Sequence, residues 1–181
     1  RHGAEPQRHG AEPQRHGAEP EAEAQRYGSA LRTEWQRFGD VLQGSFWDTY
    51  ANLTQKTLLL LGWAARFCPA AQFVLKADDD SFIHTPALLA HLRSAPSPPP
   101  LYYMGRVHYG VSPNRDPRSR HHVPAWLYAP SSFPPYCSGS AYVLSMDAVL
   151  EVLRVAPSVP KVIPEDVFIG LCAERAGIHA R

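Results

Sequence analysis

The apolar and polar positions after residue 40 alternate between helix-like and strand-like stretches. Apolar residues recur at helical spacing in four segments and predict helices at 48–68, 84–94, 146–156 and 165–176. Short runs of apolar and strand-forming residues predict strands at 40–42, 71–77, 101–107 and 138–145, with a further strand opening at 178–181. In the second helix we expect Thr85 as the N-cap and Pro86 as the first helical residue.

Strands that alternate with helices are typical of an α/β domain with a mostly parallel sheet flanked by helices. In open sheets of that kind, ligands bind at the carboxyl ends of the strands. One long stretch, 109–135, breaks the alternation because it is rich in proline and basic residues. We expect it to be a loop with little regular structure, and a loop of this length in a compact domain is usually functional.

The first 24 residues differ in composition from the rest of the chain. They repeat the heptad RHGAEPQ, and each copy holds glycine and proline but no large apolar side chain. No coiled-coil seam can form from such a repeat. It predicts a disordered, low-complexity segment at 1–24, and we expect the folded domain at 25–181.

The overall composition is that of one globular domain. Hydrophobic residues make up 44% and charged residues 19% of the 181 residues, and the net charge of +1 gives no electrostatic argument for a nucleic-acid partner. The apolar run 58–63 is far too short to cross a bilayer, which needs about 20 residues. Three cysteines, Cys68, Cys137 and Cys172, are too few for a disulfide scaffold, and their pairing stays open.

Three consecutive carboxylates, Asp78, Asp79 and Asp80, follow directly after the apolar strand predicted at 71–77. Three adjacent anions repel one another, so a positive partner is expected nearby. Hard oxygen ligands at a strand end suit Mg²⁺ or Mn²⁺, which keep several waters and also bind nucleotide phosphates. The alternative is a solvated acidic turn that caps the next helix, and the apolar strand before it favours the metal site.

A second acidic pair, Glu165 and Asp166, stands at the start of the helix predicted at 165–176, where the helix dipole stabilises negative charge. The pair is either an ordinary set of first-turn acids or, if the fold brings Asp166 near the metal, the source of a general base. Asn52 begins an N-glycosylation sequon, with an unmodified asparagine on a helix face as the alternative. The histidines match no zinc-binding spacing.

Four segments in combination resemble the β-1,3-galactosyltransferase / β-1,3-N-acetylglucosaminyltransferase family. They follow the family's order and approximate spacing, and they read FGDVLQGSFWDTYANLTQKTLLLLGWAARFC, FVLKADDDSF, YCSGSAYVLS and EDVFIG. The resemblance spans about Glu34 to Gly177. Within the family, the stretches GRVH, VSPNRDP, RHHV and FPPY look most like the ganglioside-type β-1,3-galactosyltransferases.

The resemblance implies a partial GT-A (Rossmann-like) nucleotide-sugar transferase fold that lacks its first strand or strands. It also implies an inverting, Mn²⁺-dependent hexosyltransferase that transfers galactose from UDP-galactose in β-1,3 linkage to a GalNAc- or GlcNAc-ended glycolipid or glycoprotein. The alternatives are a β-1,3-N-acetylglucosaminyltransferase of the same family and a non-catalytic relative or inactive fragment. Family members are single-pass type II proteins of the Golgi membrane, so an anchor outside this sequence and a lumenal catalytic domain are expected.

The resemblance also assigns roles to the acidic residues. Asp78, Asp79 and Asp80 correspond to the family's D-x-D motif, which implies Asp80 as the main metal ligand. Asp78 is implied as a further ligand, or it faces the ribose, the sugar or bound water together with Asp79. Such a metal stabilises the negative charge that develops on the departing UDP.

The E-D-V motif of the family corresponds to residues 165–167, which implies Asp166 as the catalytic base. Glu165 and Gly139 are implied to shape the donor and acceptor pocket. The residue types suit the chemistry, because an acceptor hydroxyl needs a base to lose its proton as it attacks the anomeric carbon. A single in-line displacement inverts that carbon and needs no covalent enzyme intermediate.

Overall fold

The computed structural model describes residues 19–94 and 100–181, and the chain divides into two compact units, 1–43 and 44–181. The first unit contains the helix α1 (Glu19–Phe38). This helix begins inside the segment for which the sequence predicts disorder, where the repeat changes to EPEAEAQ; alanine and glutamate favour helix, and proline is tolerated in a first helical turn. Residues 1–18 of that predicted segment lie outside the described residues.

The end of α1 is set by a glycine. Gly39 has a φ of +68°, and its N–H donates to the carbonyl of Trp35 over 2.8 Å, which is a common way to terminate a helix. The residues that follow have no regular structure, so the strand predicted at 40–42 is not formed. The three residues Asp40 to Leu42 are too short a signal, because a strand forms only when a neighbouring strand pairs with it.

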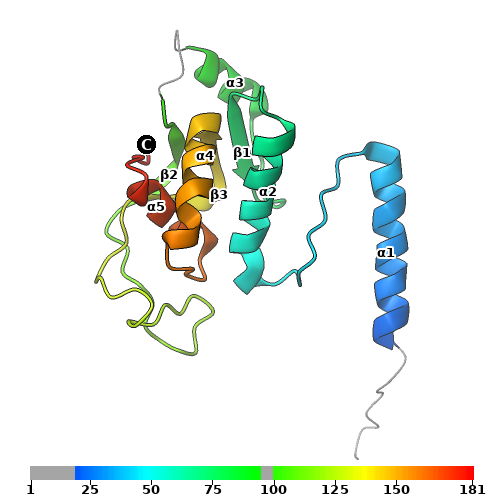
Figure 1. Cartoon of the computed structure of the whole chain (residues 1–181), viewed down its shortest axis with the longest axis horizontal. Helices are drawn as coiled ribbons and strands as arrows, with labels where there is room; N and C mark the ends of the chain where they lie inside the picture. The colour runs from blue at the N-terminus through cyan, green and yellow to red at the C-terminus, as the bar shows by residue number, and fades with distance from the viewer. Residues whose placement is uncertain (1–18, 95–99) are drawn as a thin grey trace, which may run out of the picture. The chain divides into compact units, whose positions relative to one another are not determined.

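The second unit is built on a three-stranded sheet, and its strands are β1 (Phe73–Ala77), β2 (Tyr103–His108) and β3 (Tyr136–Ser145). The strand order is β1-β3-β2, and β3 runs antiparallel to both neighbours. The prediction of a mostly parallel sheet is therefore wrong for the described strands. β1 and β2 do point the same way, as the alternation of strand and helix indicates, but β3 returns through a long loop and inserts between them in the opposite direction (Figure 1).

The C-terminal residues lie along the free edge of β2. Ala180 forms a parallel bridge with Tyr103, and the N–H of Arg181 donates to the carbonyl of Tyr103 over 3.0 Å. The N–H of Gly105 donates in turn to the carbonyl of Arg181 over 3.0 Å. The strand predicted to open at 178–181 is thus present as a single bridge.

The four helices predicted in the second unit are confirmed, with small changes at their ends. They are α2 (Leu53–Phe67), α3 (Thr85–Ser94), α4 (Met146–Val155) and α5 (Glu165–Arg175), and short 3₁₀ turns precede α2 and follow α4. Thr85 is the first helical residue of α3 rather than its N-cap, because the Nδ1 atom of His84 accepts the N–H of Ala87 over 3.1 Å. Within the described residues, no helix combines the length and the apolar character that a bilayer span requires.

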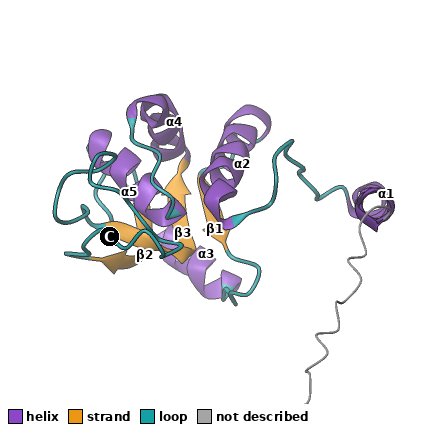
Figure 2. Ribbon diagram, turned by 90° about the horizontal axis from the view of Figure 1, so that it is seen from below, coloured by secondary structure: helices purple, strands orange, loops and turns teal. Residues whose placement is uncertain are grey.

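Helices α2, α4 and α5 pack against one another and against the sheet, while α3 lies on the other side of the strands (Figure 2). The face of α4 that is buried follows helical spacing and consists of Ala148, Val149, Val152 and Val155. By contrast, α5 is buried on nearly all sides. Gly170 allows this burial, because a Cβ atom at that position would lie 2.3 Å from the Cβ atom of Tyr136 in β3. The middle of α5 is therefore held close to the start of β3.

The long loop between β2 and β3 contains no helix or strand, as predicted, but it is packed rather than free. Val123 and Phe133 are buried in the core. The guanidinium group of Arg115 donates to the carbonyl of Val123 over 2.7 Å, and the Tyr50 hydroxyl is 2.8 Å from Nδ1 of His121. These contacts fasten the loop to itself and to the turn before α2.

Candidate functional site

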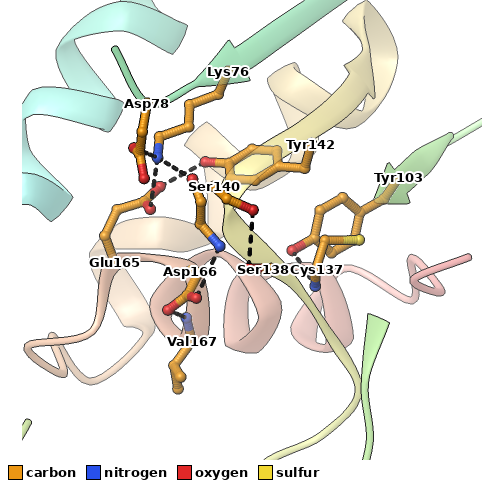
Figure 3. Close-up of polar contacts among 11 residues, drawn as sticks. Lys76, Asp78, Tyr103, Cys137, Ser138, Ser140, Tyr142, Glu165, Asp166 and Val167 are labelled. Carbon is orange, nitrogen blue, oxygen red and sulfur yellow. Dashed lines mark hydrogen bonds and ion pairs between the residues drawn. The ribbon is translucent and has the colours of Figure 1, made fainter. Parts of the chain in front are cut away.

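Asp78 and Asp166, one from each acidic segment found in the sequence, both contact β3 near its middle, at residues 139 and 140 (Figure 3). The N–H of Asp78, just after β1, donates to the carbonyl of Ser140 over 3.0 Å. The N–H of Gly139 donates to Oδ2 of Asp166, at the start of α5, over 2.9 Å. Two adjacent residues of β3 therefore connect the end of β1 with the start of α5.

Lys76 is a positive partner for the first of the three carboxylates, Asp78, and also for Glu165. Its Nζ atom lies 2.5 Å from Oδ1 of Asp78 and 3.7 Å from Oε2 of Glu165, and it also donates to the carbonyl of Gly139. Lys76 is not among the site residues predicted from the sequence. The available signal is its spacing, because residues two apart in a strand share a face and Lys76 stands two before Asp78.

Glu165 is a buried acid rather than a solvated first-turn residue. Its side chain is 5% exposed, and the Tyr142 hydroxyl donates to Oε1 over 2.6 Å. Burial raises the pKa of Glu165, and the hydrogen bond from Tyr142 and the charge of Lys76 oppose that rise. Burial and then the charge of Glu165 raise the pKa of Tyr142 well above its ordinary value, so Tyr142 remains a hydrogen-bond donor.

The carboxylate of Asp166 is oriented by two backbone N–H groups. Oδ2 accepts from Gly139 and Oδ1 accepts from Val167, each over 2.9 Å, and the residue is half-buried. A Cβ atom at Gly139 would lie 3.4 Å from Cβ and Oδ2 of Asp166, so the glycine lies in close contact with the carboxylate. After burial, the charge of Asp166 is the largest cause that raises the pKa of Tyr50 and of Tyr136. Asp166 therefore acts electrostatically on the region around these two rings.

Asp79 and Asp80 differ from the other acids because both are exposed and neither forms a hydrogen bond or ion pair with another described residue. Their hard oxygen atoms suit a divalent cation that keeps most of its waters. The described part of the chain contains no group of three or more histidine, cysteine or acidic side chains placed to hold a metal. The described residues therefore supply no complete set of protein ligands, so a cation at Asp79 and Asp80 would need water or a bound ligand at its remaining positions. Asp78 is engaged by Lys76.

The remaining sequence candidates lie outside this junction. The side-chain amide of Asn52 donates to the carbonyl of Trp47 over 2.8 Å, at the residue before α2. The three cysteines are free thiols, and burial raises the pKa of Cys137 to about 11 and of Cys172 to about 12. These two thiols are therefore protonated and inert at neutral pH.

Comparison with known proteins places this chain in a family. Residues 18–181 match the family described as galactosyltransferase. The chain is 42% identical over 165 residues to beta-1,3-galactosyltransferase 4 of Rattus norvegicus, in a match that covers 76% of this chain and 44% of the relative. It is likewise 42% identical over 139 residues to lactosylceramide 1,3-N-acetyl-beta-D-glucosaminyltransferase B of Xenopus laevis, covering 76% and 37% of the two chains.

A third relative, beta-1,3-galactosyltransferase 9 of Homo sapiens, is 39% identical over 138 residues, with 76% of this chain and 37% of the relative covered. The chain spans less than half the length of the curated relatives it matches. The family match nevertheless includes β1, β3 and α5, the three elements that build the junction of acidic residues. The chain belongs to the galactosyltransferase family.

Proposed function

We propose that the protein containing this chain is an inverting hexosyltransferase that transfers galactose from UDP-galactose, in β-1,3 linkage, to a GalNAc- or GlcNAc-ended glycolipid or glycoprotein. The observation that supports this most directly is the junction at Gly139 and Ser140. It joins the aspartate run after β1 to Asp166 at the start of α5 through the hydrogen bonds Asp78 N–H to Ser140 and Gly139 N–H to Asp166. A donor-binding segment and a base must be adjacent for a single displacement to occur.

Asp166 is the proposed general base. Two backbone N–H groups aim its carboxylate, and an acceptor hydroxyl that attacks an anomeric carbon must lose its proton to such a group. A base with a fixed orientation needs little rearrangement at the moment of proton transfer. Glu165 is too buried to meet an acceptor and instead supports the junction through Tyr142 and Lys76.

Asp79 and Asp80 would hold the Mn²⁺ ion, with Asp80 as the main ligand. Bound there, the ion supplies positive charge to the departing diphosphate of the donor. The chain's own contribution is to present two unpaired carboxylates in solvent, next to a third that Lys76 already neutralises. The proposed location is the Golgi membrane, with a type II anchor outside this sequence and this domain in the lumen.

The second candidate is transfer of N-acetylglucosamine by the same site. The Xenopus laevis relative named as a lactosylceramide 1,3-N-acetyl-beta-D-glucosaminyltransferase has the same identity to this chain, 42%, as the Rattus norvegicus galactosyltransferase. The acids at the junction do not distinguish the two donors, since both carry the same UDP group. A non-catalytic relative is disfavoured because Asp80 and Asp166 are both present.

The test uses the full-length protein, purified with its lumenal domain intact, and labelled UDP-galactose and UDP-N-acetylglucosamine as competing donors. Acceptors ending in GalNAc, GlcNAc and galactose are compared in buffer with Mn²⁺. We expect galactose transfer to the GalNAc-ended glycolipid to be the fastest reaction. A preference for UDP-N-acetylglucosamine would assign the second candidate, and no transfer from any donor would refute the proposal.

A further inference from the structure

One charged group in the junction has no part in the proposed chemistry. The ammonium group of Lys76 lies between Oδ1 of Asp78 and Oε2 of Glu165 (Figure 3). It also donates to the carbonyl of Gly139. The Lys76 side chain is only 14% exposed, so these oxygens take the place of water around the charge. An ammonium group has three donors, and a buried one is stable only when they face acceptors or opposite charges.

The contact with Gly139 matters because the same residue holds the proposed base. The carbonyl of Gly139 accepts from Lys76, and the N–H of Gly139 donates to Asp166 over 2.9 Å. Glycine has the widest backbone freedom of any residue, so the direction of its N–H depends on what holds the peptide groups on either side. The carbonyl and the N–H of Gly139 belong to the two peptide groups that flank its Cα, so a contact that holds the carbonyl removes part of the freedom with which this glycine can turn its N–H.

We propose that Lys76 is a positioning residue for the transfer: its ammonium group fixes Gly139, and Gly139 in turn fixes the carboxylate of Asp166. The effect on catalysis rests on the proposed function, whereas the chain of contacts from Lys76 to Asp166 belongs to the fold alone. The ammonium group of Lys76 also pairs with both Asp78 and Glu165, so that a single positive charge lies between the two carboxylates. Without it these two carboxylates repel each other across the same space, which would widen the junction.

The main experiment compares Lys76→Met with Lys56→Met in the full-length protein. Lys56 is a matched control because it also pairs with an aspartate, Asp48, over 3.2 Å, but both side chains are largely exposed. For Lys76→Met we expect kcat to fall at least about tenfold, since misplacing a reacting group by about 1 Å can cost about a hundredfold. The KM for UDP-galactose should stay within about threefold, because the change acts on the base rather than on the donor.

A conservative variant and a second readout separate positioning from general stability. Lys76→Arg keeps the charge and should recover most of the lost kcat. Amide hydrogen exchange at Gly139, measured without substrate or metal, should speed up in Lys76→Met but not in Lys56→Met or Lys76→Arg. If Lys76→Met does not fold, the neutral Lys76→Gln variant, which keeps a hydrogen-bond donor, takes its place in both measurements with the same expected directions.

The possible results distinguish a failure of the proposed function from a failure of the proposed role of Lys76. A wild-type protein without transfer activity overturns the proposed function and leaves the exchange measurement as the test of Lys76. Unchanged exchange at Gly139 overturns the positioning role. Three kinetic results would also overturn it. These are a kcat of Lys76→Met equal to that of Lys56→Met, a change in KM alone, and a loss of kcat in Lys76→Met that Lys76→Arg does not recover while both proteins remain folded.

Discussion

The two acidic segments of this protein have opposite environments although their sequences look alike. Asp79 and Asp80 are exposed and bind no other described residue, whereas Glu165 and Asp166 have protein donors on their carboxylates. A carboxylate that already accepts N–H and O–H groups has a fixed direction. One that faces only water is free to bind an exogenous cation. The carboxylates at the start of α5 are thus oriented by the fold itself, whereas under the proposed function those of Asp79 and Asp80 would be oriented only by a bound cation.

The strongest test of this comparison is removal of the free carboxylate at Asp80. We expect Asp80→Ala to abolish Mn²⁺-dependent transfer by the full-length protein, since the proposed cation loses its main ligand. The free energy of unfolding without metal should change by less than about 0.5 kcal/mol, as for most exposed substitutions. Undiminished turnover would refute the metal assignment, and Asp48→Ala, at an exposed aspartate outside the junction, is the control.

The second test removes the charge of the oriented carboxylate. Asp166→Asn should lower kcat by at least about a hundredfold, because general-base assistance contributes about 10²–10⁴-fold. Calorimetry should show near-normal binding of the UDP-sugar with Mn²⁺, because Asp79 and Asp80 are unchanged. Loss of donor binding would make Asp166 a donor-site or structural residue, and a normal kcat would remove it from the mechanism.

The third test concerns the buried donor to Glu165. Tyr142→Phe removes the hydroxyl that lies 2.6 Å from Oε1 of Glu165 and leaves that buried oxygen with fewer partners. We expect a loss of about 1–3 kcal/mol in the free energy of unfolding, measured by urea denaturation. Tyr128→Phe is the control, because its hydroxyl donates to the carbonyl of Ser132 at an exposed site. Equal effects of the two variants would contradict the special environment of Glu165.

The smallest expected effect is a pH dependence. Burial raises the pKa of Glu165 above its ordinary value of 4.5, so the folded protein binds this proton more tightly than the unfolded chain. The contribution of protonated Glu165 to the free energy of unfolding is therefore fully present below pH 4.5 and is lost as the pH rises through the raised pKa of the folded state. Glu165→Gln does not titrate, so the stability of the wild type relative to this variant should fall as the pH increases across that interval. A rise with pH would contradict the direction of the shift.

The helices of the second unit could be predicted from the sequence because their signals are local. The apolar spacing in 146–156 and the proline before Glu165 predict α4 and α5 within a residue or two. The direction of the sheet could not be predicted this way. It depends on where the chain returns after the loop 109–135, and no local pattern encodes that β3 inserts between β1 and β2. Strand order is a long-range property.

The candidate site likewise has residues that local sequence patterns predict and residues that only the fold brings together. The aspartate run and the pair at 165–166 are visible as charge patterns next to predicted elements, and the structure brings both to β3. Tyr142 is not visible in the sequence, because a tyrosine in a strand has no distinctive neighbours, and the only sign of Lys76 is its spacing from Asp78. Their roles arise only when β1, β3 and α5 meet and Glu165 is buried between them. Lys76 and Tyr142 become partners of Glu165 because the fold buries this acid beside their strands.

The insertion of β3 between β1 and β2 has a consequence for how the chain folds during synthesis. β1 and β2 leave the ribosome first, yet each has β3 as its hydrogen-bonded neighbour in the sheet. Until about residue 145 has emerged, the backbone N–H and C=O groups of β1 and β2 in the nascent chain have no partner strand. Unpaired strands of this kind are prone to associate with other chains. Pairing across this sequence distance is slow because the connecting loop must close first. A chain interrupted within the loop 109–135 would therefore lack the central strand and present two open edges, which predicts aggregation rather than a smaller folded domain.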